Sequence, residues 1–245
     1  MGPSTVLRLM GMAVLATLCA LAAALSAGDA LPNQKDGVAV ATAHAISSQQ
    51  PADDAQQVDF DPDRVAYLEA AGWRAYYDRN WPRVFGLMVQ TNREQFGMSL
   101  LTAIAAAIDI VRASIAFAPI DNDVPAATNH LQAFYDKARR SLGLPAEART
   151  LAALEMDYWV VHRRLAIERK QAPNHDGNIE PMVEALARLH AALFAAPPEA
   201  IRRSAELRAQ AAVAVDRITG GYSTDIEDDW RKVEESLRQA YGSLQ

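Results

Sequence analysis

A carboxylate and an imidazole share the apolar face of one predicted helix, between residues 150 and 170. Leucine and tyrosine side chains recur there at spacings of three, four and seven, and Glu155 and His162 fall inside the same stripe. Both side chains are therefore predicted to point into the protein. Burying either one is costly unless it finds a hydrogen bond or a counter-charge, so other helices must supply partners.

Further ionisable side chains lie on apolar faces of other predicted helices. They are Glu69, Asp109, Arg112, His130 and His190. Together with Glu155 and His162, they form a candidate polar pocket inside a helix bundle, suited to a catalytic or ligand-binding site. The alternative is a set of structural ion pairs and hydrogen-bonded imidazoles, and we favour it because periodicity alone is an uncertain guide to burial.

The spacing of these groups argues against metal and nucleophilic chemistry. The sequence has no Glu-x-x-His pair of the kind that places two ligands on one ion in a carboxylate-bridged bundle. Glu155 and His162 are seven residues apart, which is about 10.5 Å along a helix. Motifs for a serine nucleophile elbow or a phosphate-binding loop are also missing. No metal site is predicted, and any cofactor is unknown.

A loop provides a second candidate site. Asp121, Asn122 and Asp123 follow Pro119, and three consecutive capping residues exceed what one helix start needs. The surplus carboxylates could bind a ligand or core arginines. A structural cap is the favoured alternative.

The elements that must position these groups are all predicted to be helices. Alanine-rich apolar runs, capping residues and helix-starting prolines recur from residue 60 onward, and no run alternates as a strand would. We expect one all-α helical-bundle domain of about seven to eight helices over residues 60–245. The most apolar run, from Met98 to Phe117, is expected to be the central buried helix. Asp109 and Arg112 argue against its crossing a membrane.

The N-terminal region has the layout of an export signal. Arg8 precedes 17 apolar residues from Leu9 to Leu25, and small residues follow. We expect residues 1–27 to be a signal peptide or membrane anchor and residues 28–59 to be a disordered linker. The protein is then exported: periplasmic, secreted or tethered to a membrane. The alternative is a cytoplasmic protein with a mis-assigned start codon. Cys19 is the only cysteine, so no intramolecular disulfide can form.

The charge balance narrows the range of partners. The net charge is -6 and the pI is about 5.4, so the protein lacks the long-range attraction that would gather phosphates. Nucleic acid is therefore not an expected partner. Membrane contact is expected only through an uncleaved N-terminal segment. The leading hypothesis is an exported or envelope-associated binding or scaffold module for an unknown small molecule or protein. The alternative is an enzyme or small-ligand protein whose polar pocket is built around Glu155, His162 and Asp109.

Overall fold

The fold is described by a computed structural model, which covers residues 60–172, 174, 175 and 177–244. Within these residues the chain forms eight α-helices and no strand, which confirms the all-α prediction. The helices are α1 (Pro62–Tyr77), α2 (Trp81–Phe96), α3 (Leu100–Phe117), α4 (Val124–Leu142), α5 (Ala148–Gln171), α6 (Glu180–Phe194), α7 (Pro198–Gly220) and α8 (Ile226–Gly242). The expected leader, linker and Cys19 lie outside the described residues.

Capping side chains fix where several helices begin. The Asp61 carboxylate accepts hydrogen bonds from the backbone N–H groups of residues 63 and 64, and Pro62 occupies the first helical position. Asp123 caps α4 in the same way. At α8, Asp225 caps the helix by accepting from the N–H of residue 228, and α8 begins at Ile226. The helix boundaries thus follow local chemistry to within a few residues.

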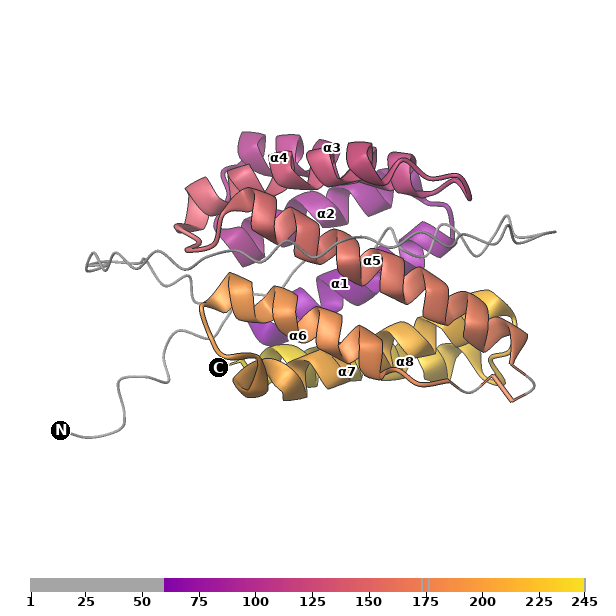
Figure 1. Ribbon diagram of the computed structural model, residues 1–245. Coiled ribbons are helices and arrows are strands. Elements are labelled where there is room, and N and C mark those ends of the chain that lie inside the picture. The colour runs from indigo at the N-terminus through magenta and orange to yellow at the C-terminus, as the bar shows by residue number, and fades with distance from the viewer. Residues whose placement is uncertain (1–59, 173, 176, 245) are drawn as a thin grey trace.

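The eight helices form a closed ring of neighbours. Each helix packs extensively against the next one in sequence, and α8 packs back against α1. In Figure 1, α3 and α4 lie along one edge of the bundle, and α6, α7 and α8 lie along the opposite edge. Phe60, just before α1, packs edge-on against Tyr241 of α8, with ring centroids 5.9 Å apart. The first and last described helices are therefore adjacent.

The position of α3 differs from the prediction. This helix packs against α2 and α4 at the edge of the bundle, so it is not the central helix. By length and by its mean hydropathy of 1.9, α3 could cross a membrane. Only 39% of the helix is buried, so it is not the buried helix that was expected. Leu101, Ile108 and Ile115 form an exposed line, with relative exposures of 79%, 39% and 67%. We call these three residues the α3 stripe.

A buried helix was expected because α3 is apolar around most of its circumference. Such a composition is typical of a helix surrounded by protein. Alanines at positions 103, 106, 107 and 113 are fully buried against the bundle and account for only one side of the helix. The larger aliphatic side chains of the α3 stripe point away from it, so the apolar surface of α3 exceeds what its two neighbours cover.

Candidate functional site

Glu155 is fully buried on α5, as predicted, and its carboxylate is held by two donors. The Tyr135 hydroxyl of α4 donates to Oε2 at 2.8 Å, and the Trp159 indole N–H donates to Oε1 at 2.7 Å. Burial raises the pKa of Glu155 to about 7, although both donors and the charge of Arg208 lower it. Glu155 is thus a carboxyl group that titrates near neutral pH while sealed from water.

His162 is also fully buried, two turns further along α5. Its Nε2 lies 3.2 Å from Oδ1 of Asp216 on α7, and the ring stacks on Tyr158. Asp216 also accepts a hydrogen bond of 2.5 Å from Nη1 of Arg169, one further heptad along α5. The pair of His162 and Asp216 has the arrangement of a base and its orienting carboxylate. Arg169 neutralises that carboxylate with an ion pair.

The sequence interpretation missed Asp216 and Arg169. The spacing of 155, 162 and 169 places Arg169 on the same line of α5, and this signal could have identified it. Asp216 follows an Ala-Val run on α7, so its inward position was also readable. What spacing cannot provide is the pairing itself, because α5 and α7 are separated in sequence by all of α6.

A third buried cluster joins three helices. Arg208 of α7 donates from both terminal nitrogens to the Glu69 carboxylate of α1, at 2.6 and 2.9 Å. The Tyr241 hydroxyl of α8 donates to Glu69 and accepts from Arg208 at 2.8 Å. All three side chains are almost completely buried. The predicted inward position of Glu69 is confirmed, and its partners make it part of an ion pair.

His190 of α6 is buried without a counter-charge. Neither of its ring nitrogens makes a hydrogen bond within the described residues, and the ring meets the edge of Phe194. Burial, and then the nearby charge of Arg208, lowers the pKa of His190 well below its ordinary value. His190 is therefore a neutral imidazole at physiological pH.

The remaining predicted pocket residues lie elsewhere. Asp109 is buried, but it pairs with Lys137 of α4 at 2.5 Å, on the side of the bundle that holds α3. Arg112 is exposed, and His130 is only partly buried. The expected inward direction of Arg112 is therefore wrong: Asp109 and Arg112 are about 60° apart around the helix, and only Asp109 faces α4.

In the candidate loop site, formed by residues 121–123, the observed contacts are structural. Asp123 accepts from the N–H of residue 126 at 2.9 Å, while Asp121 is exposed and Asn122 is partly buried. Arg163 holds this connection through backbone carbonyls and not through the loop carboxylates: it donates to the oxygens of Phe117 and Pro119. Its guanidinium also lies 3.8 Å from the centre of the Phe117 ring.

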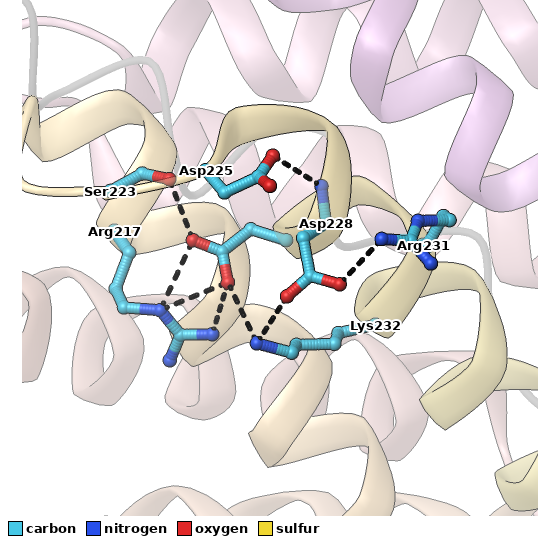
Figure 2. A network of polar contacts seen from close by, with 7 residues as sticks. Arg217, Ser223, Asp225, Asp228, Arg231 and Lys232 are labelled. Atoms are coloured by element: carbon cyan, nitrogen blue, oxygen red, sulfur yellow. Dashed lines mark hydrogen bonds and ion pairs between the residues drawn. The ribbon is translucent and has the colours of Figure 1, made fainter.

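A network of charges orders the connection between α7 and α8. Figure 2 shows Arg217 and Ser223 facing the first turn of α8, where Asp225 and Asp228 lie. Arg217 and Ser223 bind the Asp229 carboxylate, at 2.6 Å for Nη2 and 2.8 Å for Oγ. Burial raises the pKa of Asp229, but these two hydrogen bonds outweigh it and the net pKa is lowered. The acidic run therefore stabilises the helix start and its junction with α7.

Glu155, His162 and Asp109 do not converge on a shared opening. Glu155 is closed by Tyr135 and Trp159, His162 by Asp216, and Asp109 by Lys137. In the described part of the chain, no three His, Cys, Asp or Glu side chains are grouped so that they could hold a metal ion. These polar groups are arranged as structural pairs. The α3 stripe is a surface feature that packing among the described residues does not explain.

Comparison with known proteins finds no family model, curated sequence or solved structure that matches the chain.

Proposed function

We propose that the protein is an exported or envelope-associated helical binding or scaffold module, and that the α3 stripe is its contact surface. One observation carries this proposal: the most apolar helix of the bundle leaves Leu101, Ile108 and Ile115 exposed. Contiguous exposed apolar surface is costly in water and commonly marks an interaction site.

The polar interior supports a structural role. A catalytic acid or base must reach its substrate, directly or through one water. Glu155 and His162 have relative exposures of 0%, and each already contacts side chains of the same chain. Buried pairs of this kind fix how helices pack, because breaking one leaves an uncompensated polar group.

The enzyme alternative retains one observation in its favour. Asp216 orients His162 through Nε2, and Nδ1 of His162 makes no hydrogen bond within the described residues. An imidazole with one nitrogen oriented by a carboxylate and the other free is the arrangement of a general base. For this role, α5 and α7 would have to separate and admit a substrate.

Export is supported by sequence alone. Arg8, the apolar run from Leu9 to Leu25 and the small residues after it form the expected order of a signal peptide or anchor. An anchor that stayed in place would hold the α3 stripe within reach of other envelope components through residues 28–59.

In-cell photo-crosslinking tests the contact surface. A photoreactive residue is placed at Leu101 or Ile115 in the native cells, and Ile226 of α8, with 52% exposure, serves as the matched control. We expect defined adducts from both stripe positions in the envelope fraction and none from Ile226. If neither stripe position forms an adduct of any kind, the proposed function is wrong.

A second measurement separates the binding module from the enzyme. The purified chain is screened against metal ions and metabolites by thermal shift, because a ligand that prefers the native state stabilises it. A stabilising ligand whose effect disappears in both Glu155→Gln and His162→Gln would favour the enzyme. We expect no ligand with that dependence.

A further inference from the structure

We propose that the α3 stripe binds the α3 helix of a second copy of this chain, with the two helices antiparallel. This inference rests on the proposed function, since it names the partner of the same surface. It is carried by the spacing, symmetry and charge of residues on and beside α3.

The exposed residues repeat with the period of a helix–helix seam. Leu101, Ile108 and Ile115 are seven residues apart, and Ile104 and Val111 lie beside them at the intervening positions. Apolar side chains at alternating spacings of three and four are what one helix presents to another in a coiled coil. Ile104 and Val111 also contact the bundle core, so the seam is anchored to the bundle.

The stripe is self-complementary about its centre. Leu101 and Ile115 are equally far from Ile108, so a two-fold axis near Ile108 places Leu101 against Ile115 of the partner subunit. A closed dimer of this kind uses the same patch on both copies. Antiparallel packing also opposes the two helix dipoles.

Charges favour the same orientation. α3 carries two ionisable side chains: Asp109, which pairs with Lys137, and Arg112, which is exposed beside Ile108 and Ile115. No unpaired acid therefore lies on the seam, despite the net charge of -6. At the start of α3, the last turns of α2 and α4 provide the exposed arginines Arg93 and Arg140. The opposite end carries the exposed Asp121 and Asp123, with Arg163 held beside them on the carbonyls of Phe117 and Pro119. An antiparallel pair brings each basic end towards an acidic one.

The size of the contact sets its strength. Eighteen residues of helix extend about 27 Å, and a strip about 10 Å wide covers far less than the roughly 800 Å² per partner of a standard interface. The dimer is therefore weak and reversible, and depends on protein concentration.

Sedimentation velocity over a concentration series tests the dimer with the purified full chain. We expect a reversible monomer–dimer equilibrium whose dissociation constant rises at least about tenfold in Leu101→Glu and in Ile115→Glu. Ile226→Glu, a matched exposed position on α8, should leave the dissociation constant unchanged. Circular dichroism and thermal melting of each variant check that the fold is retained. Association that the two stripe variants leave unchanged would arise elsewhere and would overturn the inference.

Cysteine crosslinking tests the orientation. In a Cys19→Ser background, Ile108→Cys places the two thiols close to the two-fold axis, and a short bifunctional thiol reagent should join them. Leu101→Cys places its thiols at opposite ends of the contact, about 20 Å apart, and should not crosslink. Efficient crosslinking of Leu101→Cys would show a parallel pair and overturn the antiparallel arrangement.

Failure of this inference is distinguishable from failure of the proposed function. A monomeric chain that floats with phosphatidylcholine vesicles, and loses flotation in Leu101→Glu, would overturn the second copy while retaining the stripe as a contact surface. In-cell adducts with other proteins, combined with a monomer in solution, would do the same. The proposed function itself fails only if the stripe positions form no adduct in cells.

Discussion

Glu155 makes the stability of the protein sensitive to pH. Its pKa is raised from 4.5 to about 7 in the folded chain, mainly by burial. Between these two values the native state binds more protons at Glu155 than the unfolded state does, so the contribution of Glu155 to stability is greatest below pH 4.5 and is lost as the pH rises through 7. The penalty reaches about 3 kcal/mol once the buried group is ionised.

Glu155→Gln should remove this dependence. The amide can accept from the Trp159 indole and donate to the Tyr135 oxygen, so it reproduces the neutral acid. We expect the variant to match the parent near pH 4 and to exceed it by about 3 kcal/mol at pH 8, measured by chemical denaturation across that range.

A matched control lies on the same helix. Asp157 is exposed and pairs with Arg188, so Asp157→Asn should show no comparable trend between pH 5 and 8. A difference between parent and Glu155→Gln that stays constant with pH would show that Glu155 does not titrate in this window.

At the scale of the helix, two glycines illustrate how surroundings decide a substitution. A Cβ on Gly86 of α2 would meet no atom within 4 Å, whereas a Cβ on Gly220 of α7 would lie 2.2 Å from the Tyr222 ring. That ring is stacked on His175 at 4.0 Å. The stacking of Tyr222 on His175 therefore connects the end of α7 to the loop before α6, and the Tyr222 ring lies against Gly220.

Alanine at the two positions should have opposite effects. Gly86→Ala should stabilise the chain by about 0.5 to 1 kcal/mol, because alanine loses less backbone entropy in a helix. Gly220→Ala, at the last residue of α7, gains less propensity and must displace Tyr222, and forced overpacking costs about 1 to 3 kcal/mol. We expect net destabilisation in thermal or chemical denaturation. Stabilisation of similar size at both positions would contradict the close contact.

Sequence patterns predicted most of the helices because their signals are local. Asp61 with Pro62, and Asp123 before α4, are capping signals that lie within a few residues of the helix start they control. The burial of Glu155, His162 and His190 followed from periodicity, because those helices have distinct polar and apolar faces.

The helix whose position was wrongly predicted, α3, has no distinct polar and apolar faces. α3 is apolar on nearly every side, so periodicity could not identify which face meets the bundle, and both the central position of α3 and the inward direction of Arg112 were wrong. The partners Asp216 and Arg208 were missed for another reason. Each pairs across tens of residues, and spacing within one helix carries no information about a second helix.

At the scale of the whole molecule, Arg208 ties the ends of the bundle together. Its bonds to Glu69 and Tyr241 connect α7 to both α1 and α8. Arg208→Met should destabilise the chain by about 3 to 5 kcal/mol, because it leaves the buried Glu69 charge without its counter-charge. Chemical denaturation of the variant measures this loss.

The buried Glu69 carboxylate, deprived of its counter-charge, is the expected cause of the stability lost in Arg208→Met. Adding Glu69→Gln to Arg208→Met should therefore recover a substantial part of the stability. The exposed pair of Arg74 and Glu227 also joins α1 to α8 and provides the control: Arg74→Met should have a much smaller effect, since water and salt screen that pair. Equal losses in Arg74→Met and Arg208→Met would show that burial does not set the cost.

The contact between Phe60 and Tyr241 has a consequence for chain connectivity. Because the first and last described helices lie side by side, a short peptide could join them while new ends are opened at another exposed connection, such as the one between α4 and α5. Such a circular permutant would keep every helix between its present neighbours. The contact of α1 with α8 is the one extensive pairing in the described residues that is remote in sequence, and it would become local in the permutant. The contact of α4 with α5 would in turn become the one that joins the two ends of the chain, so the contact order would stay nearly the same and the loop-closure entropy would oppose that pairing instead.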